Sequence, residues 1–129
     1  KQDSEIYSDY EISVEQQSHY KIRILHLDGQ FFFGSISQIV SHFDELLETK
    51  YIILTYNSNI ELDMSAIFAL EDIIVRLQSQ HIKLLLVITN ENVHNKIVEM
   101  HTITDQIGES SLFKDEKDAI NVAVENIRK

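Results

Sequence analysis

The segment from Ile52 to Leu70 constrains the fold of this chain more than any other part of the sequence. An unbroken apolar run, Ile52–Leu54, is followed by a polar loop and then by Asp63-Met64-Ser65-Ala66. Beyond this point apolar residues recur at three- and four-residue spacing, which predicts a buried strand that leads into a helix. The first backbone N–H groups of a helix lack internal partners and carry partial positive charge. Asp63 and Ser65 therefore occupy a position that favours an anionic group.

A second apolar run, Ile82–Ile88, repeats this arrangement. Like Tyr51–Tyr56, it lacks the alternation of polar and apolar residues that a strand with one solvent-exposed face shows. The absence of this alternation is typical of parallel strands covered on both faces. A helical apolar pattern follows it over about Glu91–Met100. We therefore expect alternating strands and helices, with these two strands central and adjacent.

The first half of the chain predicts a hairpin and a helix. Tyr20–Leu27 is rich in β-forming residues, Asp28-Gly29 is a tight-turn signal, and Gln30–Phe33 follows. Gly34-Ser35 ends the hairpin, and apolar residues at helical spacing over Ile36–Leu47 predict the first helix, with the serine as its N-cap.

The end of the chain predicts one short strand and a final helix. Ser111–Phe113 forms the strand, and Asp115 is the expected N-cap of a helix with a buried stripe from Ala119 to Ile127. The sequence thus predicts one α/β domain over residues 20–129, preceded by a linker or edge strand over residues 1–19. Its sheet is mixed, begins with the hairpin and continues through right-handed βα crossovers, with four main helices.

The charge of the chain limits its partners. A formal net charge of −10 argues against nucleic-acid binding and against a polybasic membrane patch, because both surfaces would repel it. The absence of cysteine excludes disulfides and thiolate metal sites. No stretch approaches the roughly 20 apolar residues that a membrane-spanning helix needs, so we expect a soluble segment without direct membrane insertion.

Enzymatic motifs are missing from the sequence. It has no phosphate-binding glycine loop, no H-E-x-x-H, no G-x-S-x-G and only three glycines. His94 and His101 lie seven residues apart, but a metal site needs more ligands. We therefore expect no catalytic residues, no metal and no cofactor.

Two groups of residues remain open to two interpretations each. Asp63 and Ser65 either only cap the helix, a contribution of roughly 1 kcal/mol, or Ser65 accepts phosphate. In the second case a charge of about −1.5 to −2 would be favoured by the helix dipole and opposed by Asp63. In Phe31-Phe32-Phe33, the side chains either pack in the core, which is the default, or Phe32 and Phe33 contribute to an interface.

The segment Gly29–Ser35 resembles the G-x-L-F-F-G-S segment of the cytoplasmic STAS domain at the carboxyl end of sulfate permease (SulP) family anion transporters. Asp63-Met64-Ser65-Ala66 is similar to the D-A-[ST]-G helix start of that family. Three further segments match in the same order, so that the resemblance covers Tyr20 to about Val124: residues 69–72, 81–86 and 107–113 with Ala119.

This resemblance implies the STAS fold and a non-catalytic regulatory and interaction domain of a SulP-type secondary anion transporter. It places the domain on the cytoplasmic side of the inner (plasma) membrane. The implied partners are the transmembrane domain of its own transporter and other cytoplasmic proteins, and the resemblance allows a homodimer formed through the parent transporter.

The same fold occurs in stand-alone anti-sigma factor antagonists, in which the serine matching Ser65 is phosphorylated by a partner kinase. Phe32-Phe33-Gly34-Ser35 favours the transporter branch. Two residues depart from the family pattern: Ala66 stands where glycine is usual, and Met64 is bulkier than the customary residue.

Overall fold

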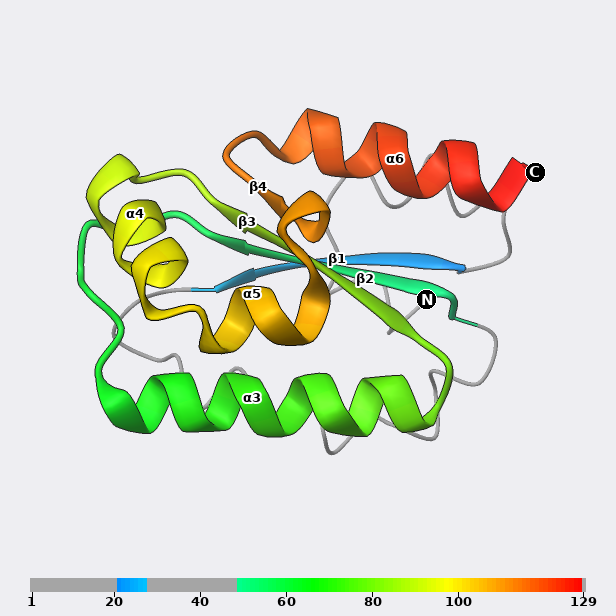
Figure 1. Cartoon of the computed structure of the whole chain (residues 1–129). Coiled ribbons are helices and arrows are strands. Elements are labelled where there is room, and N and C mark those ends of the chain that lie inside the picture. Colours follow the sequence, from blue (N-terminus) through cyan, green and yellow to red (C-terminus); the bar gives the residue numbers. More distant parts are fainter. Residues whose placement is uncertain (1–20, 28–48, 129) are drawn as a thin grey trace.

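In the described residues, four parallel strands form one sheet at the centre of the domain (Figure 1). The structure is a computed structural model that describes residues 21–27 and 49–128. Within them the strand order follows the chain order: β1 (Ile22–Leu27), β2 (Tyr51–Tyr56), β3 (Lys83–Ile88) and β4 (Leu112–Phe113).

The two predicted apolar strands are central and adjacent, as expected. Tyr51 on β2 is in register with Ile22 on β1 and with Lys83 on β3, and all three described strand pairs are parallel. The strands β2 and β3 are covered on both faces, which explains why their sequences show no polar alternation.

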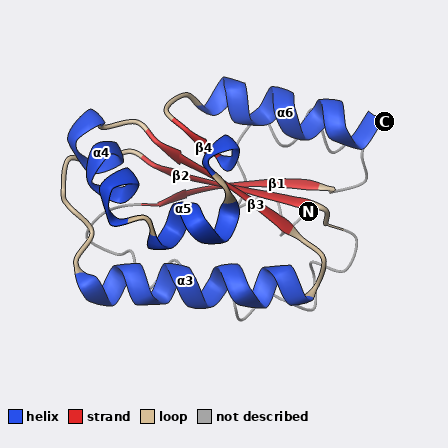
Figure 2. Cartoon of the chain, in the orientation of Figure 1, coloured by secondary structure: helices blue, strands red, loops and turns tan. Residues whose placement is uncertain are grey.

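Helices cover both faces of this sheet (Figure 2). One face packs against α3 (Met64–Ser79), α4 (Glu91–Met100) and α5 (Thr102–Ile107), and its core includes Leu54, Leu86 and Ile74. The other packs against α6 (Glu116–Arg128), with Ile53 and Ala123 in its core. Odd and even positions of β2 therefore supply two separate cores, as the side-chain alternation of a strand requires.

Helix starts follow the predicted caps. The backbone N–H of Ala66 donates to Asp63 Oδ1 at 2.8 Å, and the N–H of Lys117 donates to Asp115 Oδ1 at 3.0 Å. The caps at Asp63 and Asp115 are thus confirmed, and each satisfies one N–H that has no partner within its helix.

The sequence did not predict α5. The chain leaves α4 at His101, which has a left-handed φ of 68°, and enters a helix of six residues. Such a short helix gives too few turns for a periodic apolar pattern. The predicted strand over Ser111–Phe113 is also one residue too long, because Ser111 belongs to a 3-10 turn over Glu109–Ser111 and only Leu112–Phe113 pair with β3.

Several predictions lie outside the described residues. They concern the linker or edge strand over residues 1–19, the second hairpin strand with Phe32 and Phe33, and the helix over 36–47. The mixed character of the sheet depends on that second hairpin strand and stays a prediction.

Candidate functional site

The loop from β2 to α3 holds the first candidate site in a fixed position. The Tyr56 hydroxyl donates to the Ile60 carbonyl oxygen at 2.6 Å, and the Ile60 N–H donates to Ser58 Oγ at 3.1 Å. Tyr56 is buried in the sheet, so this contact anchors the loop to the core. The loop then delivers Asp63 to its capping position at the start of α3.

Ser65 lies in the first turn of α3 with an exposed side chain. Asp63 provides the cap, so the serine hydroxyl is not needed for that purpose. No hydrogen bond joins the Ser65 side chain to any residue in the described part of the chain. The sequence did not decide whether Asp63 or Ser65 caps the helix. The geometry assigns the capping role to Asp63.

Three large apolar residues at or shortly before the first turns of α3 are exposed, and we call them the α3 patch: Ile60, Met64 and Phe68. Their side chains are 46%, 54% and 59% exposed. Met64 and Phe68 are four residues apart and so lie on one face of the helix. Exposed apolar side chains in a group of this kind mark interaction surfaces.

Sequence reasoning missed the α3 patch, although the signal was present. The buried stripe of α3 includes Ile67, Leu70 and Ile74. Met64 and Phe68 are large apolar residues that fall outside this stripe. Apolar residues on the polar side of a helical pattern have no core to fill, which is the observation that could have revealed the patch.

A polar cluster joins the two sheet strands β1 and β2 to α6. The Thr55 hydroxyl donates to Glu116 Oε2 at 2.8 Å, and His26 Nε2 lies 2.8 Å from the same oxygen. Thr55 is buried, so water does not provide an acceptor for its hydroxyl, and Glu116 provides one instead. This cluster contains one carboxylate and one imidazole, and it fixes the amino end of α6 on the sheet.

His94 and His101, the two histidines of the sequence analysis, lie on α4 and directly after it. In the regions that the structure describes, no group of three or more metal-ligating side chains gathers. Burial, followed by the charge of Lys114, lowers the pKa of His94, while Glu91 acts in the opposite direction. His101 instead takes the left-handed position between α4 and α5.

Parallel strands joined by helices on both faces define an α/β domain built from βα crossovers. The family model for the STAS domain matches residues 12–119, and the chain belongs to the STAS domain family. No curated protein sequence matches it. None of the helices in the described segments is both long and apolar enough to cross a membrane.

Solved structures of other proteins share this fold. The structure of a SulP transporter STAS domain from Vibrio cholerae has a TM-score of 0.76 at 24% identity, covering 93% of this chain and 98% of the other. A sulfate transporter family protein from Wolinella succinogenes has a TM-score of 0.68 at 20% identity, covering 84% and 89%. The STAS fold expected from the sequence is confirmed, and the resemblance extends to the STAS domains of SulP transporters.

Proposed function

We propose that this chain is a non-catalytic regulatory and interaction domain of a SulP-type secondary anion transporter, on the cytoplasmic side of the inner (plasma) membrane. The α3 patch carries the proposal, since Ile60, Met64 and Phe68 expose apolar surface at the start of a helix. The similarity to a SulP transporter STAS domain and to a sulfate transporter family protein supports the choice of parent protein.

The proposed partner of the α3 patch is the transmembrane part of the same transporter. Methionine and aromatic side chains suit such a contact, because both are enriched at protein interfaces and methionine adapts its shape. Asp63 and the exposed Ser65 lie beside Met64 and provide polar groups at the edge of the contact. Other cytoplasmic proteins are further partners of the same surface.

Site-specific crosslinking in the full-length protein tests this proposal. A photoreactive phenylalanine analogue replaces Phe68, and a protease site is placed within residues 1–19. The matched control carries the analogue at Glu125, which is exposed on α6 at the other face of the sheet. After irradiation and protease cleavage in membranes, the variant with the analogue at position 68 should keep the domain attached to the transmembrane part. The variant with the analogue at position 125 should release it. Release from both positions would contradict the proposal.

The second candidate function is a stand-alone anti-sigma factor antagonist that phosphorylation switches at Ser65. The observation that favours it is the exposed Ser65 hydroxyl in the first turn of α3, where the helix dipole favours an added phosphate. A kinase-containing extract with ATP should then give a retarded band on a phosphate-affinity gel. This band should disappear in Ser65→Ala and persist in Ser110→Ala, another exposed serine. No band in the wild type counts against the switch.

A further inference from the structure

Three lysines lie at the amino-terminal ends of the strands. The start of α3 lies at the opposite end of the sheet, beyond the carboxyl-terminal ends of the strands. Lys21, Lys50 and Lys83 stand at or directly before the first residues of β1, β2 and β3. Their backbones are tied together, because the N–H of Lys50 donates to the Lys21 carbonyl at 2.8 Å and the N–H of Lys83 to the Lys50 carbonyl at 2.9 Å. The rigid sheet therefore fixes where these three side chains begin.

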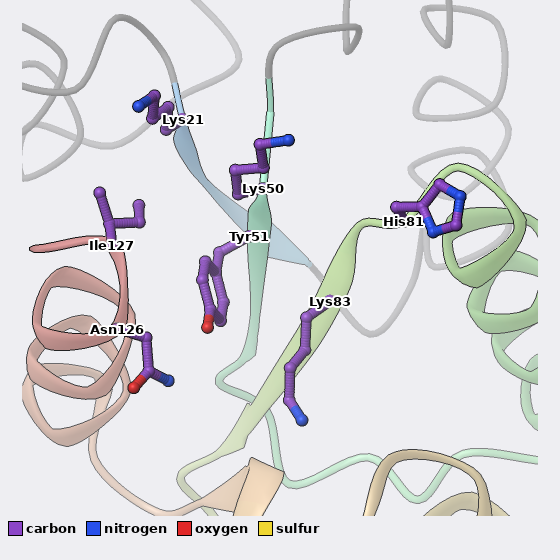
Figure 3. Close-up of a pocket in the computed structure, with 7 residues that line it drawn as sticks. All are labelled: Lys21, Lys50, Tyr51, His81, Lys83, Asn126 and Ile127. Carbon is purple, nitrogen blue, oxygen red and sulfur yellow. The ribbon is translucent and has the colours of Figure 1, made fainter. Parts of the chain in front are cut away.

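The three lysines line a hollow of about 390 Å³ (Figure 3). The picture shows its side chains coming from the strand starts, from the turn after α3 and from the last turn of α6. The remaining described lining residues are Tyr51, His81, Asn126 and Ile127. Besides the three ammonium groups, the side chains of Tyr51 and Asn126 also offer hydrogen-bond donors in this lining.

The described lining of the hollow carries no acidic side chain: neither Asp nor Glu is among these residues. Within residues 21–27 and 49–128, the ion pairs are His26 with Glu116 and Arg76 with Asp72, and neither involves Lys21, Lys50 or Lys83. The three ammonium charges are therefore not neutralised by described carboxylates of the domain.

This concentration of positive charge contrasts with the composition of the chain. The net charge is −10, yet three of the six lysines in the described residues border one hollow. A cation near the carboxyl end of α6 is favourable for that helix. Figure 3 shows the three ammonium groups pointing in different directions, so rotation of the flexible lysine side chains is needed to bring them onto one anion.

We propose that this hollow binds a multiply charged phosphate or sulfate group. The group would be held by Lys21, Lys50 and Lys83, with Tyr51 and Asn126 as neutral donors. Lysine is a flexible point-charge ligand for phosphate, so the site closes around the anion by side-chain rotation. The same chemistry is offered by a free oxyanion and by the phosphate monoester of a lipid headgroup. The proposal does not depend on the parent protein being a transporter.

The test titrates the domain with sodium phosphate at constant ionic strength and follows backbone amide resonances. The expected result is a saturable shift confined to residues around Lys50, Lys83 and Asn126. The Lys50→Gln/Lys83→Gln double variant should bind phosphate more weakly by about fivefold for each charge removed. The control double variant, Lys96→Gln/Lys117→Gln, removes two exposed lysines elsewhere and should bind as the wild type does.

A second arm distinguishes the source of the phosphate group. The same proteins are sedimented with phosphatidylcholine vesicles that contain or lack phosphatidic acid. Binding that needs phosphatidic acid and is lost in Lys50→Gln/Lys83→Gln assigns the site to a headgroup, and saturable binding of inorganic phosphate assigns it to a free oxyanion. The proposal is overturned if neither ligand binds, if the wild-type shifts map to other residues, or if the control pair weakens binding equally.

Discussion

His26 Nε2 lies 2.8 Å from Glu116 Oε2, which joins the carboxyl end of β1 to the first residue of α6. The same carboxylate oxygen accepts the Thr55 hydroxyl at 2.8 Å. One side chain thus connects two adjacent strands, β1 and β2, to the helix that covers one face of the sheet.

Replacing Glu116 with alanine should lower the free energy of unfolding by about 1–3 kcal/mol, because it leaves the buried Thr55 hydroxyl without its acceptor. Urea denaturation measures this change. Asp118→Ala is the matched control, since Asp118 is exposed in the same first turn and the Thr55 hydroxyl donates to Glu116 instead. If both variants lose the same stability, the helix dipole rather than the Thr55 contact explains the effect.

Removing the cap of α3 should also destabilise the domain. Asp63→Ala deletes the acceptor for the Ala66 N–H, and we expect a loss of about 1 kcal/mol in thermal or chemical unfolding. Ser65→Ala should change the stability by less than about 0.5 kcal/mol, because the exposed hydroxyl provides no cap. Equal losses for the two substitutions would contradict the assignment of the cap to Asp63.

The α3 patch should be nearly neutral for folding, unlike the buried stripe beside it. Ile67 is 1% exposed and its replacement by alanine should cost about 2–5 kcal/mol. Phe68, the next residue, is 59% exposed and Phe68→Ala should cost less than about 0.5 kcal/mol. Calorimetric unfolding of both variants provides the comparison, and a large loss for Phe68→Ala would show that this side chain serves the fold rather than an interface.

His94 should make the stability of the domain depend on pH. Its pKa is lowered in the folded state, first by burial and then by Lys114, so the unfolded chain binds the proton more readily. The contribution is present above the ordinary histidine pKa of 6.5 and is lost as the pH falls through the lower folded pKa. We therefore expect stability to decrease with acidification, with a smaller decrease in His94→Gln. Urea curves between about pH 7.5 and about pH 5 measure this slope, and an unchanged slope in the variant would exclude His94 as its source.

Much of the described fold could be predicted because its signals are local. The apolar runs at Tyr51–Tyr56 and Ile82–Ile88 and the caps at Asp63 and Asp115 each lie within a few neighbouring residues. The predicted starts and ends of these elements agree with the structure to within one residue or two. The helix α5 was not predicted, because its six residues form fewer than two turns and so show no periodic apolar pattern.

The sites were less accessible to sequence reasoning because they depend on contacts between distant residues. Thr55 and Glu116 are 61 positions apart, and no spacing rule relates them. Lys21, Lys50 and Lys83 become neighbours only once three strand starts align in parallel. A net charge of −10 argued against basic surfaces in general, yet a total charge carries no information about where the cations gather.

The most direct test of the central claim is the sequence of the gene upstream of the codon for Lys1. A cytoplasmic domain of a SulP-type transporter requires about ten or more apolar segments there, each of roughly 20 residues. Finding these segments in the same reading frame is the expected result. A start codon immediately upstream, with no such segments, would contradict the transporter assignment and favour the stand-alone switch.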